Sequence, residues 1–168
     1  MARRIEHRTR SDWGVPVVYR TLIDPEYLRE RLKVLGGHNA ALLEHEVTTD
    51  GARYRLRHGV AGEDLPGVLG RLLGDSITVD RQESWRADSN GDYSGTVRVT
   101  IAGTPGDMSG TQKIVADGDG SVRSVEGSVR IPIPLIGGAV EENVARQVTD
   151  LLTKESDFTD DWLRTHQG

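Results

Sequence analysis

Residues 107–132 read DMSGTQKIVADGDGSVRSVEGSVRIP, and this stretch decides the fold. Apolar and polar residues alternate on both sides of the glycine-rich segment Asp117–Gly120. The alternation predicts two antiparallel strands joined by a tight turn, because successive side chains of a strand point to opposite faces. Placing Gly118-Asp119 at the tip of the turn sets the register. The opposite pairs expected are Ile114 with Arg123, Gln112 with Val125, Gly110 with Gly127 and Met108 with Val129.

Three further turn signals, Asp50-Gly51, Asn90-Gly91 and Pro105-Gly106, separate segments of the same alternating kind. Together the four turns predict a meander of antiparallel strands. The expected strands lie near residues 3–12, 40–49, 52–61, 76–87, 92–103, 107–117 and 120–132.

Two of these turns carry their own predictions of register. Ser89-Asn90-Gly91 is expected to be a three-residue loop in which Gly91 is left-handed. Asp50-Gly51 is expected to be a two-residue type I′ turn, which makes His45 and His58 diagonal neighbours. The pairs that follow from it are Thr49 with Ala52, Val47 with Tyr54, His45 with Leu56, Leu43 with His58, Glu46 with Arg55 and Glu44 with Arg57.

Helical spacing of apolar residues appears in two places. Val15–Leu35 is predicted to form two short helices, separated at Asp24-Pro25 because proline suits a first helical turn and aspartate suits a cap. Ile136–His166 carries apolar residues at steps of three and four, which predicts one long helix with a stripe facing the sheet. The segment Glu63–Gly74 interrupts the strand pattern and is expected to be a short helix or a mobile flap.

Composition excludes several classes of protein. The 168 residues fit a single domain, 1–168, and the absence of cysteine excludes disulfides and thiolate metal sites. The start lacks the apolar segment of a signal peptide, so a cytoplasmic location is expected. No apolar run is long enough for stable membrane insertion, and the net charge of −5 disfavours nucleic acid as a partner. The composition fixes neither an oligomeric state nor a protein partner.

Polar residues interrupt the apolar inward face of the predicted sheet. Leaving them unsatisfied there would cost roughly 1–3 kcal/mol each, so they either bond to one another or line a space that holds water or a ligand. These polar residues are His45, His58, Arg81, Glu83 and Gln112.

The order of these elements resembles that of the START or polyketide-cyclase-like helix-grip superfamily, also called SRPBCC. The segments Ile131–Glu141 (IPIPLIGGAVE) and Glu155–Leu163 (ESDFTDDWL) are similar to an actinobacterial domain-of-unknown-function family within it. The resemblance implies an α+β helix-grip fold. In such a fold a curved seven-stranded antiparallel sheet surrounds a long C-terminal helix, and the cavity between them often takes apolar molecules. It supplies no catalytic residues.

We therefore expect non-covalent binding of an apolar or amphipathic small molecule, such as a lipid or polyketide, between the sheet and the last helix. We assign no catalytic residue, metal site or cofactor. The candidate ligand-binding residues are Tyr54, Leu56, His45, His58, Arg81, Trp85, Val97, Val99, Gln112, Ile114 and Val144.

Two alternatives belong to other functional classes. A cyclase or dehydratase would use His45 or His58 as a general base, with Glu83 as a second proton carrier, because imidazole titrates near neutral pH. A structural or oligomer-forming domain would have a filled core and no useful void. A metal site at His45 and His58 lacks a third ligand, since His7 is expected on the far side of the sheet.

Overall fold

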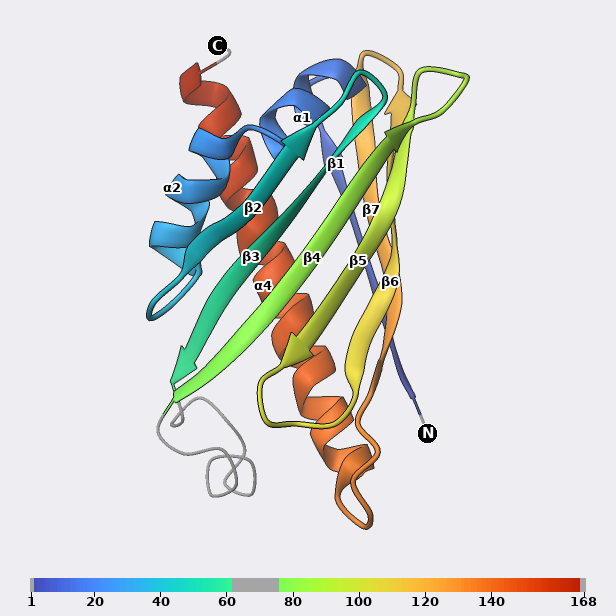
Figure 1. The fold of residues 1–168 in the computed structure, drawn as a ribbon. Coiled ribbons are helices and arrows are strands. Elements are labelled where there is room, and N and C mark those ends of the chain that lie inside the picture. Colours follow the sequence, from blue (N-terminus) through green and yellow to red (C-terminus); the bar gives the residue numbers. More distant parts are fainter. Residues whose placement is uncertain (1, 62–75, 167–168) are drawn as a thin grey trace.

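The computed structural model describes residues 2–61 and 76–166. Within this part of the chain, seven antiparallel strands form one sheet that curves around a long C-terminal helix (Figure 1). The predicted α+β helix-grip architecture is confirmed. Its elements are β1 (Arg3–Ser11), α1 (Val15–Leu22), α2 (Pro25–Leu35), β2 (Ala41–Val47), β3 (Gly51–Ala61), β4 (Ser76–Ala87), β5 (Tyr93–Ile101), β6 (Asp107–Asp117), β7 (Gly120–Arg130) and α4 (Gly137–His166).

The sheet has the order β1-β7-β6-β5-β4-β3-β2, so β2 to β7 form the predicted meander and β1 closes it beside β7. All four predicted β6–β7 pairs, including Gln112 with Val125, are confirmed. Gly118 has φ +59°, a conformation that glycine adopts at little cost. The three-residue loop before β5 is also confirmed, since the Asp88 N–H donates to the Asp92 carbonyl at 2.8 Å and Gly91 has φ +88°.

The predicted β2–β3 register is wrong by two residues. The tip of the turn is Thr49-Asp50, because the Thr48 N–H donates to the Gly51 carbonyl at 2.8 Å and the Thr48 hydroxyl accepts from the Gly51 N–H at 3.1 Å. Gly51 belongs to β3, where a Cβ would lie 2.0 Å from the Trp85 carbonyl oxygen. Glycine is therefore needed here for a close approach between strands, not for a turn.

This shift changes which side chains meet. His45 lies opposite Tyr54 and not beside His58, so the predicted diagonal histidine pair does not exist. An irregularity between Leu42 and Glu44 leaves Leu43 40% exposed, although it was expected to face inward. A shift of two residues leaves each side chain on the same face of the sheet, so glutamates of β2 still pair with arginines of β3, but with different partners. These are Glu46 with Arg53 at 2.8 Å and Glu44 with Arg55 at 3.8 Å.

The helices form where the sequence predicts them. Asp24 caps α2 by accepting a hydrogen bond from the Glu26 N–H at 2.9 Å, and Pro25 occupies the first helical turn. α4 lies across the concave side of the sheet, and its C-terminal end lies beside α1 and α2 (Figure 1). The expected element at Glu63–Gly74 lies outside the described residues. No helix among those residues is both long and apolar enough to cross a membrane.

The buried apolar residues form two clusters at opposite ends of α4. One joins α1 and α2 to β3 and β4 and includes Tyr54, Trp85 and Leu163. The other joins β1 and β5–β7 to the N-terminal half of α4 and includes Val97 and Val140. A cavity between the sheet and α4 adjoins the second cluster.

The junction of β7 and α4 depends on a buried carboxylate. Glu141 is only 4% exposed, and one of its oxygens accepts a hydrogen bond from the Ile131 N–H at 2.8 Å. A Cβ at Gly137 would lie 2.4 Å from the Ile131 carbonyl oxygen, so glycine allows the helix to begin directly against the end of the strand. These contacts explain why glycine stands at position 137 and glutamate at position 141 in the Ile131–Glu141 segment.

Replacing Glu141 with alanine is expected to lower the free energy of unfolding by about 1–3 kcal/mol, because the Ile131 N–H loses its buried acceptor. Glu141→Gln keeps an acceptor oxygen and should lose less. Glu142→Ala is the matched control, since Glu142 is 58% exposed and its ion pair with Arg3 spans 3.5 Å. Urea denaturation of the three variants measures the differences, and equal losses for Glu141→Ala and Glu142→Ala would contradict the structural role.

Candidate functional site

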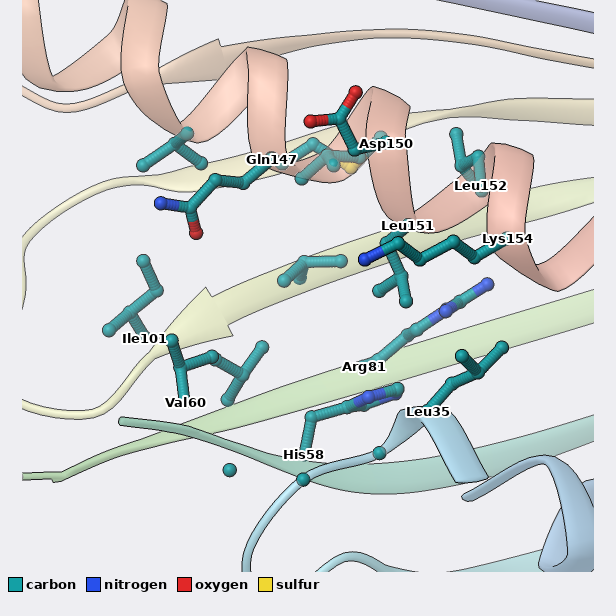
Figure 2. A pocket seen from close by; sticks show the side chains of 18 of the residues that line it. Leu35, His58, Val60, Arg81, Ile101, Gln147, Asp150, Leu151, Leu152 and Lys154 are labelled. Carbon is teal, nitrogen blue, oxygen red and sulfur yellow. The ribbon is translucent and has the colours of Figure 1, made fainter. Parts of the chain in front are cut away.

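A cavity of about 580 Å³ lies between the concave face of the sheet and α4 (Figure 2). Most of its wall is apolar and comes from strands β3–β7 on one side and from α4 on the other. The volume is in the range of small-molecule sites, roughly 300–1,000 Å³. The apolar lining residues of the strands and of α4 include Ile77, Val79, Val97, Val99, Ile101, Val144, Val148 and Leu151.

Three glycines of closely packed backbone, Gly36, Gly37 and Gly59, line one side of the cavity. The connection from α2 to β2 lies directly on β3, and the Gly59 N–H donates to the Gly36 carbonyl at 2.8 Å. A Cβ at Gly37 would lie 1.9 Å from the Gly59 carbonyl oxygen, and a Cβ at Gly59 would lie 2.0 Å from that of His38. Only glycine fits such an approach.

The inner end of the cavity is polar. His58 from β3 and Arg81 from β4 project in the same direction there, and Leu35 of α2 lies beside them (Figure 2). Gln112 from β6 also lines the cavity and is 2% exposed. Its amide nitrogen donates to the Ser84 and Thr96 carbonyls at 3.2 and 3.4 Å. Because both partners are acceptors, the atom that faces them must be the amide nitrogen, and the amide oxygen is the remaining acceptor of this side chain.

Behind this end lies a buried group of four charged residues, Arg31, Arg81, Glu83 and Glu155, which we call the ion cluster. Arg81 binds both carboxylate oxygens of Glu155, at 2.8 and 2.9 Å, and its Nε lies 3.0 Å from Glu83. Arg31 lies 3.6 Å from Glu155 and 3.9 Å from Glu83. All four side chains are at most 6% exposed, so the cluster joins α2, β4 and α4 in a region without solvent.

Mutual attraction keeps the ion cluster charged despite its burial. Burial alone would raise the pKa of Glu155, but Arg31 and Arg81 beside it hold that pKa well below its usual range. Burial would lower the pKa of Arg81, and Glu155 and Glu83 raise it instead. The ion cluster contains two arginines and two glutamates in mutual contact, so its formal charges sum to zero.

For His58, in contrast, burial and the neighbouring charges together favour the neutral form. Burial is the main cause that lowers the pKa of His58 to about 4, and Arg81 and Arg31 together lower it more than Glu155 and Glu83 raise it. The imidazole is therefore neutral at physiological pH. Its Nε2 is buried and has no hydrogen-bond partner in the described part of the chain.

The structure brings six of the predicted site residues to the cavity and leaves five outside it. The six that line it are His58, Arg81, Val97, Val99, Gln112 and Val144. The other five belong to the end of the sheet that α1 and α2 cover. Tyr54, Leu56, Trp85 and Ile114 are buried in the first core cluster, where the Trp85 Nε1–H donates to the Tyr54 hydroxyl at 3.2 Å. His45 lies 2.6 Å from the Ile23 carbonyl, to which its Nε2 donates.

Sequence reasoning missed two members of the ion cluster. Glu155 occupies the apolar stripe of α4, and Arg31 occupies the buried face of α2 between Leu28 and Leu32. A charged residue at an otherwise apolar position of a helix indicates a buried partner of opposite sign. Arg31 and Glu155 are two such residues of opposite charge, and this feature of the sequence could have predicted their ion pair. Among the described residues, no three His, Cys, Asp or Glu side chains are grouped to hold a metal ion.

Comparison with known proteins identifies the family. Residues 6–163 match the family described as "Protein of unknown function (DUF2505)". The chain belongs to this family. Uncharacterized proteins of Mycobacterium tuberculosis and Mycobacterium bovis are each 27% identical to this DUF2505 protein over 106 residues, 62% of its chain. The matched stretch spans 61% of the length of these relatives.

Solved structures share the fold of this DUF2505 protein at low identity. A Thermus thermophilus protein has a TM-score of 0.64 at 16% identity, with 99% of this chain and 100% of that chain covered. The Zhui aromatase/cyclase of a Streptomyces species has a TM-score of 0.64 at 12% identity, with 100% and 97% covered. Norcoclaurine synthase from Thalictrum flavum has a TM-score of 0.59 at 14% identity, with 100% and 90% covered. These similarities confirm the helix-grip fold.

Removing one member of the ion cluster should be far more costly than removing an exposed charge. Arg81→Met is expected to lower the free energy of unfolding by about 3–5 kcal/mol, because Glu155 is left buried without its closest partner. Arg53→Met on the outer face removes a 2.8 Å ion pair with Glu46 and should cost at most about 1 kcal/mol.

Combining Arg81→Met with Glu155→Leu should destabilise less than the sum of the two single changes, because the double variant leaves neither charge without its partner. Guanidinium or urea denaturation measures the four variants. Additive losses would contradict a direct coupling between Arg81 and Glu155.

The buried His58 predicts a pH dependence of stability. Its folded pKa of about 4 lies below the unfolded value of about 6.5, so unfolding is coupled to proton uptake between those values. The stability that this gives is fully present above about pH 6.5 and is lost as the pH falls toward 4. From pH 7.5 to 5 the loss is about 2 kcal/mol.

The same pH series on His58→Gln isolates this contribution, since glutamine does not titrate. The free energy of unfolding of the variant should fall by about 2 kcal/mol less than that of the wild type between pH 7.5 and 5. A His38→Gln control, at an exposed residue, should follow the wild type. Parallel curves for wild type and His58→Gln would contradict the lowered pKa.

Proposed function

We propose that this protein binds an apolar or amphipathic small molecule non-covalently in the cavity between the sheet and α4. The observation that carries the proposal is the cavity itself, about 580 Å³ with a mostly apolar wall and a few polar groups at one end. Ligand sites typically combine these two features. A domain that existed only as a scaffold would be expected to fill such a space, because protein interiors are close-packed.

The apolar wall would supply most of the binding free energy. Burial of apolar surface contributes about 25 cal/mol per Å², so 200 Å² of ligand surface would contribute about 5 kcal/mol before the costs of binding. The polar end would orient the ligand, because only His58, Arg81 and Gln112 offer polar groups near the inner end of the described wall.

The structural neighbours support a small-molecule role. One is an aromatase/cyclase, and norcoclaurine synthase was solved in complex with dopamine and hydroxybenzaldehyde. The shared fold therefore accommodates small organic molecules in at least that relative. Fold similarity at 12–14% identity is a weak basis for assigning a reaction, so we carry over the binding of a small molecule and no chemistry.

A cyclase or dehydratase reaction fits the geometry less well. His45 lies outside the cavity against the Ile23 carbonyl, which leaves His58 as the histidine nearest a ligand's inner end. A general base works best with a pKa near the working pH, whereas burial lowers that of His58 to about 4. Binding without turnover is therefore the function that the cavity favours.

Filling the cavity tests the proposal. Val99→Trp should reduce the binding of an uncharged fluorescent probe, N-phenyl-1-naphthylamine, at least tenfold, because the indole occupies the space between β5 and α4. Thr100→Trp is the matched control, since the neighbouring residue on β5 points to the outer face, where it lies opposite Asp80 of β4. Fluorescence titration measures both variants, and circular dichroism checks their fold.

Undiminished probe binding by a folded Val99→Trp protein would contradict the location of the site. A wild-type protein that binds no apolar probe, and that carries no passenger in native mass spectrometry, would contradict the function.

A further inference from the structure

We propose that the cavity selects a ligand without net charge, and that the ligand presents a hydroxyl or another neutral hydrogen-bond donor to its inner end. This inference rests on the proposed binding function and specifies its ligand class. Three features of the described residues carry it: the balanced ion cluster, the orientation of the Gln112 amide, and the opposite charges of the α4 residues that line the cavity.

The arginine at the inner end is not available to a ligand carboxylate. Both Nη atoms of Arg81 bind Glu155, at 2.8 and 2.9 Å, and its Nε lies 3.0 Å from Glu83. With Arg31 included, the ion cluster has two positive and two negative charges. A carboxylate that entered the inner end would lose its hydration without gaining an unpaired cation, which is unfavourable in a buried site.

A cationic ligand group meets the same difficulty. Glu83 and Glu155 are the acidic members of the ion cluster, and both are already held by Arg81. His58 adds no charge, because its imidazole is neutral at physiological pH. The inner end is thus close to electrically neutral, although it contains five ionisable side chains within a small volume.

Gln112 is the group at the inner end whose hydrogen-bonding role is fixed, whereas the Nε2 of His58, which has no hydrogen-bond partner among the described residues, donates or accepts according to its tautomer. The Gln112 amide nitrogen donates to the Ser84 and Thr96 carbonyls, and the residue lines the cavity, so the oxygen is the hydrogen-bonding group that it can offer to a ligand there. An acceptor calls for a donor on the ligand, such as a hydroxyl. An ether or ester oxygen at the same place would put two acceptors together and leave the Gln112 oxygen without a partner.

The residues of α4 that line the cavity do not restore a preference for one sign of charge. Two exposed residues of α4 with opposite charges, Asp150 and Lys154, also line the cavity, and the Asp150 carboxylate points away from the strands (Figure 2). Val60, Ile101 and Leu151 are apolar side chains of the same wall, and Gln147 of α4 adds a neutral amide to it (Figure 2). The wall therefore favours an apolar body with a neutral donor at its inner end.

Three probes of equal chain length test the inference at pH 7.5: 1-dodecanol, dodecanoate and dodecyl methyl ether. Each is titrated against N-phenyl-1-naphthylamine bound to the wild-type protein. We expect 1-dodecanol to displace the probe at a concentration at least about tenfold lower than dodecanoate and about fivefold lower than the ether. Dodecanoate that binds as tightly as the alcohol, or more tightly, would overturn the inference and leave the binding function intact.

Two variants and one matched control locate the selectivity. Gln112→Met should bring the alcohol and the ether to equal affinity, whereas Thr111→Met, on the outer face of the same strand, should keep the fivefold difference. Glu155→Gln leaves a net positive charge in the ion cluster and should improve dodecanoate relative to the alcohol by about tenfold.

If Glu155→Gln does not fold, the comparison of the three compounds on the wild-type protein still tests the inference. An unchanged alcohol-to-ether ratio in folded Gln112→Met would overturn the assignment of Gln112. Failure of the fluorescent probe and of all three compounds to bind would instead overturn the proposed function.

Discussion

The contact of Arg81 with Glu155 holds the structure together across its longest helix. It joins β4 to α4 through two charge-assisted hydrogen bonds, and Arg31 extends it to α2. The two parallel hydrogen bonds fix both the rotation of α4 about its axis and its distance from the sheet. Apolar contacts constrain these two quantities less strictly. A buried carboxylate deprived of these arginines would be costly, so the helix has few alternative positions.

A second buried carboxylate fixes the other end of the same helix. Glu141 holds the start of α4 to the end of β7, and Glu155 lies about 21 Å further along the helix axis. The cavity lies along the stretch between these two anchors, where Val144, Val148 and Leu151 face the sheet. Two rigid attachments therefore keep open a space that an apolar helix, free to settle, would tend to close.

Much of the fold could be predicted from alternation and turn residues, and the exceptions have specific causes. The β6–β7 register followed from Gly118, which does adopt a left-handed turn conformation. The β2–β3 register did not follow from Gly51, because that glycine serves a close contact with Trp85 and the Thr48 side chain moved the turn. Local sequence does not distinguish these two uses of glycine.

The candidate site was predicted in part for a related reason. Alternation shows which side chains face inward, and His58, Arg81 and Gln112 do so. Alternation does not show which part of each strand the short helices α1 and α2 cover. Tyr54 and Trp85 lie under these helices, but from the sequence they could not be distinguished from Val97 and Val99, which line the cavity. Arg31 and Glu155 meet across 124 positions of the chain, and that pairing depends on the packing of α2 against α4.

The glycine-lined side of the cavity limits how this protein can change over evolution. Where Gly37 and Gly59 meet, no side chain can be added without separating the α2–β2 connection from β3. The opposite side consists of α4 side chains that project from a helix anchored at both ends, so they can be exchanged without moving the backbone. Substitutions that reshape the space between sheet and helix are therefore tolerated on the α4 side, whereas the contact between Gly37 and Gly59 does not admit them.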